Sequence, residues 1–264
     1  MTATARLNAT ATGAMEAPAM VFAHGFGCDQ SMWRKVAPEF EVDHRVIRYD
    51  LVGAGGSDLS AYDIDRYSRL EAHAEDLVEL CRSLDVIGGT FVGHSVSAMI
   101  GVLAHRAAPD VFSSLVLIGP SARYLDDDGY LGGFSKGDID DLLEMMASNH
   151  LGWQQPLSTM VMAEDAPELR EELEASFCRT RPDIAHHFAA VTFNGDNRAD
   201  LREVTVPTLV IQTTRDAIAP VSAGEFVRDQ ISNSTWALID GSGHCAHLSA
   251  PAETIKAIRE FLST

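Results

Sequence analysis

Residues 93–97 (GHSVS) have the pattern of a serine nucleophile held on a sharp turn between a strand and a helix. The apolar run 90–92 precedes them, and a run of small residues follows. Such a turn exposes the side chain at its apex and admits only small neighbours. Gly93 and Ser97 meet that demand, although the usual pattern has glycine at the last position. Taken alone, the same residues also suit an ordinary strand-to-helix turn capped by a serine.

An acid and a histidine follow Ser95 in the chain order that folds with this turn require. Asp216 comes after the apolar run 206–212, which is typical of a buried parallel strand. His244 comes after a second strand candidate, residues 235–239, and a glycine-rich loop. Loops at the carboxyl ends of parallel strands gather at one edge of a sheet. The sequence therefore predicts a catalytic triad of Ser95, Asp216 and His244.

Each member of the triad has a competing interpretation. Asp216 also suits the cap of a helix that begins near Pro220. His247 stands three residues after His244 and is the alternative histidine, but His244 directly follows the glycine loop and is preferred. His94 is interpreted as a structural neighbour of the nucleophile. No carboxylate or cysteine set with ligand spacing accompanies the two later histidines, so no metal site is predicted.

A second glycine-rich segment supplies candidate donors for a developing oxyanion. Residues 24–27 (HGFG) follow the apolar run 20–23, so they lie at the end of another strand. The amides of Phe26 and Val96 are the predicted oxyanion hole, with a plain glycine turn as the alternative. The cluster at residues 53–58 is not a dinucleotide site, because Asp58 stands where that fingerprint needs glycine.

The elements that must position these residues alternate between strands and helices. The chain has 264 residues, 46% of them hydrophobic, which suits one α/β domain with an insertion. We predict an N-terminal core part at residues 1–119, a helical lid at residues 120–200 and a C-terminal core part at residues 201–264. The predicted core helices cover residues 68–84, 96–106 and 251–262, and the predicted lid helices cover 138–148, 153–162, 167–179 and 183–193.

The predicted lid carries several aromatic side chains that suit an apolar cavity above Ser95, although any one aromatic is more often part of a core. We expect the lid to determine the substrate. The predicted pocket residues are Tyr124, Phe134, Trp153, Phe188, Phe193 and Ile218.

Charge and composition exclude several other functions. The formal net charge of −18 disfavours contact with nucleic acid or an anionic membrane surface. The first 19 residues lack the pattern of a secretory signal, and no run is long enough to span a membrane, so we expect a cytoplasmic protein. The four cysteines, Cys28, Cys81, Cys178 and Cys245, show no paired spacing and are expected to be free thiols.

Taken together, these motifs resemble the RsbQ-type α/β-hydrolases, which include a bacterial energy-stress regulator and the plant strigolactone and karrikin receptors. The resemblance covers nearly the whole chain. It is carried by the segments HGFGCDQ (24–30), DLVGAGGSD (50–58), AYD (61–63), VGHSVSAMIGV (92–102), GGF (132–134), DAIAP (216–220) and GHCAH (243–247).

The resemblance implies an α/β-hydrolase fold, a mostly parallel central sheet flanked by helices, with an inserted four-helix lid over Ser95, Asp216 and His244. We expect a cofactor-free serine hydrolase that cleaves a small, largely apolar ester or lactone. A carbon–carbon bond hydrolase would use the same triad. The resemblance also implies an alternative, a ligand sensor with slow hydrolysis and a regulatory protein partner.

Overall fold

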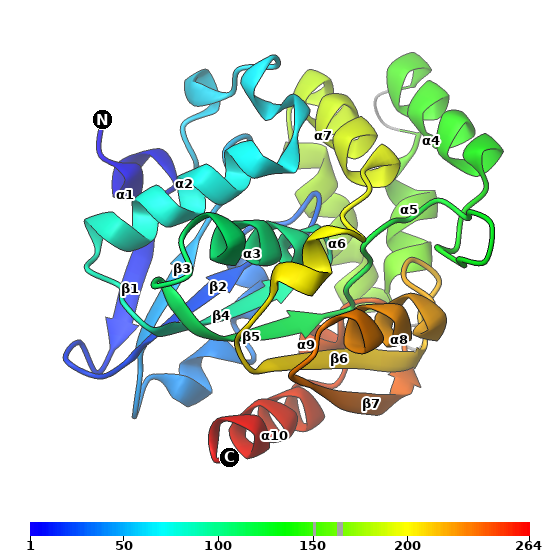
Figure 1. Ribbon diagram of the computed structural model, residues 1–264. Coiled ribbons are helices and arrows are strands. Elements are labelled where there is room, and N and C mark those ends of the chain that lie inside the picture. The colour runs from blue at the N-terminus through cyan, green and yellow to red at the C-terminus, as the bar shows by residue number, and fades with distance from the viewer. Residues whose placement is uncertain (150–151, 163–165) are drawn as a thin grey trace.

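The computed structural model describes residues 1–149, 152–162 and 166–264, without the side chain of Cys178. In this described part, seven strands form one sheet in the order β1-β3-β2-β4-β5-β6-β7, with β1 antiparallel to its neighbour and the other strands parallel (Figure 1). The strands are β1 (Thr10–Gly13), β2 (Ala19–Ala23), β3 (Arg45–Tyr49), β4 (Gly89–His94), β5 (Phe112–Ile118), β6 (Thr208–Arg215) and β7 (Ser234–Ser242).

Helices connect the strands and cover the sheet, as the alternation of patterns predicts. They are α1 (Ala3–Arg6), α2 (Leu70–Ser83), α3 (Val96–Ala107), α4 (Lys136–Ser148), α5 (Gln154–Val161), α6 (Pro167–Arg179), α7 (Pro182–Asn194), α8 (Val221–Gln230), α9 (Ala246–Ser249) and α10 (Pro251–Leu262). Helices α4 to α7 lie between β5 and β6 in the chain, within two residues of the predicted lid helices at each end. The predicted division into core and lid segments remains a prediction.

Both faces of the sheet are buried, because successive side chains of a strand point to opposite faces. In β2, Val21 packs into the cluster formed with α2 and α3, whereas Phe22 packs on the other face with Trp33 and Phe40. A third cluster joins α4 to α7 to the loops at the carboxyl ends of the strands. These helices lie together beyond one end of the sheet (Figure 1).

The first strand is an element that the apolar pattern did not predict. β1 consists of small and polar residues and is mostly exposed at the edge of the sheet. It pairs antiparallel with β3, with Thr10 opposite Arg48. An exposed edge strand buries too little apolar surface to show an alternating pattern.

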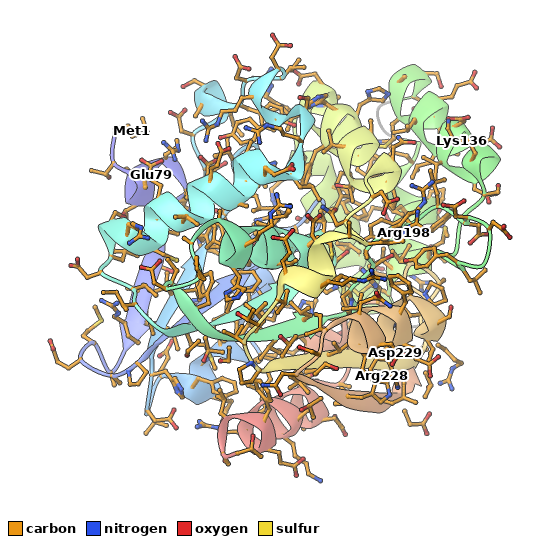
Figure 2. The ribbon with its side chains drawn as sticks, viewed as in Figure 1. Met1, Glu79, Lys136, Arg198, Arg228 and Asp229 are labelled. Carbon is orange, nitrogen blue, oxygen red and sulfur yellow. The ribbon has the colours of Figure 1, made fainter. Side chains whose placement is uncertain are left out.

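Charged side chains lie at the surface of several helices. Figure 2 labels Lys136 on α4, away from the sheet, and Arg228 on α8, whose guanidinium carbon lies 5.4 Å from the ring centroid of Trp236 in β7. None of the helices in the described part of the chain is long and apolar enough to cross a membrane.

Helix α3 approaches β4 so closely that Gly101 has no space for a side chain. A Cβ atom there would lie 2.1 Å from Cε1 of Phe91, whose buried ring is held against Phe112. We expect Gly101→Ala to lower the free energy of unfolding by about 1–3 kcal/mol through overpacking, despite the better helix propensity of alanine.

Gly137→Ala is the matched control for this measurement, because Gly137 is an exposed glycine of α4 whose added Cβ would meet no atom closer than 3.6 Å. It should raise the free energy of unfolding by about 0.5–1 kcal/mol. Denaturant unfolding of both variants provides the comparison. An unchanged or raised stability of Gly101→Ala would show that α3 is not packed as tightly as described.

Candidate active site

Ser95 occupies the single residue between β4 and α3. Its backbone has φ 58° and ψ −126°, a conformation that residues other than glycine rarely adopt. The neighbours leave no room for bulk, because a Cβ on Gly93 would lie 2.5 Å from the Phe91 ring and one on Gly25 would lie 3.2 Å from Cβ of Ser95. The hydroxyl of Ser97, at the last position of the pentapeptide, donates to the carbonyl of His24 and so ties α3 to the loop after β2.

Ser95, His244 and Asp216 form one chain of hydrogen bonds. Oγ of Ser95 lies 2.8 Å from Nε2 of His244, and Nδ1 of His244 lies 2.7 Å from Oδ2 of Asp216. With the Nδ1 proton donated to the carboxylate, the serine hydroxyl donates to Nε2. All three side chains are buried. The structure therefore brings together the three residues that the sequence predicts, in the arrangement that general-base activation of a hydroxyl requires.

Asp216 is held as a carboxylate by the groups around it. Burial alone would raise its pKa, but the charge and hydrogen bond of His244 and the amides of Ile218 and Ala219 bring the pKa below the ordinary aspartate value. The side-chain amide of Gln212, four residues earlier in β6, donates to Oδ2 over 3.0 Å. Each oxygen of the carboxylate thus accepts two hydrogen bonds, and these fix its orientation toward the imidazole.

The predicted oxyanion donors, Phe26 and Val96, follow two neighbouring strands, β2 and β4. Val96 is the first residue of α3, so its amide is one of those that the helix's own bonding leaves free. The amide of Phe26 has no hydrogen-bond partner among the described residues. The loop that carries Phe26 follows β2, which is the neighbour of β4 in the sheet. This is the point where the strand order reverses, a usual place for ligand sites in open α/β sheets.

A small cavity of about 30 Å³ lies against Ser95 and His244. Of the predicted pocket residues, Tyr124, Phe193 and Ile218 line it. The cavity is also lined by Leu157, Val161, Phe177 and Thr192, which were not among the predicted pocket residues. The spacing of Leu157 and Val161 gives an apolar face on α5, but that spacing does not distinguish a face toward a cavity from a face toward a core.

The other three predicted pocket residues lie one layer away. Phe134 and Trp153 line a neighbouring apolar groove of about 440 Å³ between α4 and α5. Phe188 packs against Phe26, with ring centroids 5.8 Å apart, and lines a separate small hollow. Leu157 and Phe193 line both the groove and the cavity at Ser95, so they form the wall between the two spaces.

Two further histidines are buried behind the site. Nε2 of His94 lies 3.1 Å from the carbonyl oxygen of His244, and the ring of His247 lies 4.5 Å from both His94 and Trp33. Burial lowers the pKa of His94 well below its usual value and that of His247 to about 3, so both are neutral. Both packing roles match the interpretation made from the sequence.

Folding also brings Cys245 to these two histidines. The ligand atoms of His94, Cys245 and His247 lie within 4.8 Å of one another, a grouping that residue spacing alone did not indicate. Among the described residues, this group has the nitrogen and sulfur donors that a soft metal ion prefers, and all three residues are buried. Cys28, Cys81 and Cys245 are free and buried, and burial raises the pKa of each thiol. The side chain of Cys178 lies outside the described part.

Comparison with known proteins identifies the class. Residues 20–257 match the model of the alpha/beta hydrolase family. A strigolactone esterase of Arabidopsis thaliana is 38% identical over 92% of this chain and 91% of its own length. The karrikin insensitive 2 receptor IA of Petunia hybrida is 36% identical over 92% of this chain and 90% of its own length.

A solved structure extends the likeness to the fold. A hydrolase from Oleispira antarctica superposes with a TM-score of 0.96 at 36% identity, covering 99% of this chain and 96% of the other. The chain belongs to the alpha/beta hydrolase family. The predicted fold class is confirmed, as are the predicted enzyme class and the resemblance to the family of strigolactone and karrikin receptors.

The backbone conformation of Ser95 carries strain that glycine would not. We expect Ser95→Gly to have a free energy of unfolding about 1 kcal/mol above that of Ser95→Ala, because the relief of strain exceeds the entropy that glycine adds to the unfolded chain. Denaturant unfolding of the two variants tests this with the hydroxyl absent from both. Equal stability, or a more stable alanine variant, would mean that the turn is not strained.

Proposed function

We propose that the protein is a serine hydrolase that cleaves a small, largely apolar carboxylic ester or lactone through an acyl-enzyme. The observation that carries the proposal is the hydrogen-bond chain from Ser95 through His244 to Asp216. The family, and relatives described as esterases, make an ester bond the substrate that this chain of residues is expected to attack.

In the proposed reaction, His244 takes the proton of Ser95 as Oγ attacks the carbonyl carbon. Asp216 holds the Nδ1 proton of His244 and stabilises the imidazolium that forms. The amides of Phe26 and Val96 donate to the oxyanion of the tetrahedral intermediate. His244 then donates its proton to the leaving alcohol, and a water molecule releases the acyl group by the same steps.

The walls of the site favour an uncharged acyl group. Phe26, Leu157, Phe177, Phe193 and Ile218 surround the cavity at Ser95, and no Lys or Arg lines it among the described residues. A substrate carboxylate there would be buried without a cationic partner, which is costly. The cavity of about 30 Å³ holds no more than about two water molecules, so an ester needs more space than it offers. The groove behind Leu157 and Phe193 is the proposed source of that space.

A second candidate function is a ligand sensor whose slow hydrolysis accompanies a signal to a protein partner. It is favoured by the similarity to a karrikin receptor over most of the chain. The two candidates share the same site and differ in turnover, since a metabolic esterase cycles many times and a sensor retains its product or an acyl adduct.

The deciding experiment is hydrolysis of a short-chain aryl ester and of a butenolide probe, with intact-protein mass recorded alongside. We expect Ser95→Ala to abolish turnover. Asp216→Asn should lower kcat by about 10³- to 10⁴-fold, because an amide stabilises the wrong tautomer of His244. Asp240→Asn, at an exposed acid in β7, is the control that should retain activity.

Each outcome of this experiment separates the candidates. Many turnovers in the wild type, lost in Ser95→Ala, support the esterase. A single burst followed by a stable mass increase supports the sensor. Turnover that survives in Ser95→Ala would contradict the proposed nucleophile.

The wall between the cavity and the apolar groove provides a test of the substrate path. We expect Leu157→Ala to join the two spaces and to raise kcat/KM for an octanoyl aryl ester about tenfold relative to the butanoyl ester. Leu173→Ala is the matched control. Leu173 is a buried residue of α6 that lines neither the cavity nor the groove, so its truncation should leave the ratio of the two kcat/KM values unchanged. A chain-length preference unaltered by Leu157→Ala would show that the groove is not the path.

A further inference from the structure

The nucleophile has a second hydrogen-bond partner that the triad does not use. Oη of Tyr124 lies 3.2 Å from Oγ of Ser95. The Tyr124 side chain is 3% exposed, and its ring packs edge-on against Phe193. Its backbone is fixed as well, because the amide of Phe134 donates to the Tyr124 carbonyl. The phenol is therefore held at Ser95 by a residue of the segment between β5 and α4.

The direction of this hydrogen bond follows from counting protons. The hydroxyl of Ser95 has one proton, and it is donated to Nε2 of His244 when the serine is ready to react. Tyr124 must then donate its own proton to Oγ. Burial raises the pKa of the Tyr124 phenol above its usual value, so the proton stays on the tyrosine. Tyr124 is a donor in every state of the reaction and not a base.

The hydroxyl of Tyr124 has no other hydrogen-bond partner among the described residues. A phenylalanine would fill the same space and make the same ring contacts with Phe193. Packing therefore explains the aromatic ring but not the phenolic oxygen.

We propose that Tyr124 is a catalytic residue that acts mainly in the second half of the reaction, where it speeds release of the acyl group from Ser95. This inference rests on the proposed serine mechanism. During acylation Oγ is the nucleophile, and a donor that engages its lone pair lowers its nucleophilicity, which offsets the stabilisation of the charge that forms on Oγ as His244 takes the proton. During deacylation Oγ is the leaving group, and a donor is most stabilising as negative charge develops there.

The step balances without any further reactant. Water attacks the acyl carbon as His244 takes the proton of that water. The bond between the acyl carbon and Oγ then breaks, and its electron pair moves to Oγ. His244 returns the proton to Oγ, and Tyr124 keeps its own proton while its hydrogen bond to Oγ strengthens and then relaxes.

The test is Tyr124→Phe in a rapid-mixing experiment with p-nitrophenyl acetate, in which nitrophenol release reports acylation and the later steady state reports deacylation. We expect the deacylation rate to fall about ten- to a hundredfold, as for loss of a hydrogen bond to a developing charge, while acylation stays within about threefold of the wild type. The variant should release one burst equivalent of nitrophenol, and its intact mass should show an accumulated acetyl adduct that Ser95→Ala lacks.

Tyr130→Phe is the matched control. Tyr130 is also buried, and its hydroxyl donates to the carbonyl of Arg123 and not to Ser95. Its loss should leave the ratio of the two rates unchanged. A merely structural role for Tyr124 would slow both steps in proportion.

Three results would overturn the inference. Equal loss of both rates, or loss of acylation alone, would contradict a role in release of Oγ while leaving the serine mechanism intact. Acetyl transfer and turnover that persist in Ser95→Ala would overturn the proposed function itself, and the inference with it.

Discussion

The turn at Ser95 is the constraint on which the rest of the structure depends. The chain leaves β4 and enters α3 within one residue of positive φ, and this is achieved only because the helix lies almost against the strand. Gly93 and Gly101 carry no side chain and so leave room for the Phe91 ring between the strand and the helix. The hydroxyl of Ser97 donates to the carbonyl of His24 in the loop after β2. The position of the Ser95 hydroxyl therefore depends on how α3 packs on the central sheet. A change that loosens α3 is expected to displace this proposed nucleophile.

Phe26 connects this rigid base to the helices above it. Its amide is a proposed oxyanion donor, while its ring contacts Trp153, Phe177, Phe188 and Phe193, with centroids 5.8 to 6.2 Å away. The sheet thus positions the backbone of Phe26, and helices α5, α6 and α7 position its side chain. These ring contacts hold the proposed oxyanion donor in place, so the aromatic cluster restrains Phe26 as well as limiting the size of the cavity.

The sequence predicts the fold and the three central residues because both depend on local patterns. Apolar runs mark the buried strands, and Ser95, Asp216 and His244 directly follow three of them. The antiparallel β1 was missed because its small, exposed residues carry no such pattern. The lining of the cavity was predicted only in part, since Leu157 and Phe188 are equally apolar and only the crossing of the helices decides which of them faces Ser95. The contact of Tyr124 with Ser95 joins residues 29 positions apart and has no signature in the spacing.

The amide of His244 donates to the carbonyl of Val161, the last residue of α5, over 2.7 Å. His244 and helix α5 therefore share a buried hydrogen bond. A movement that lifts the end of α5 leaves that amide without its acceptor, and a displacement of His244 does the same to the carbonyl. By thermodynamic reciprocity, the free energy by which the position of α5 affects that of His244 equals the free energy by which the position of His244 affects that of α5. This hydrogen bond therefore links contacts made on α5 to the position of His244.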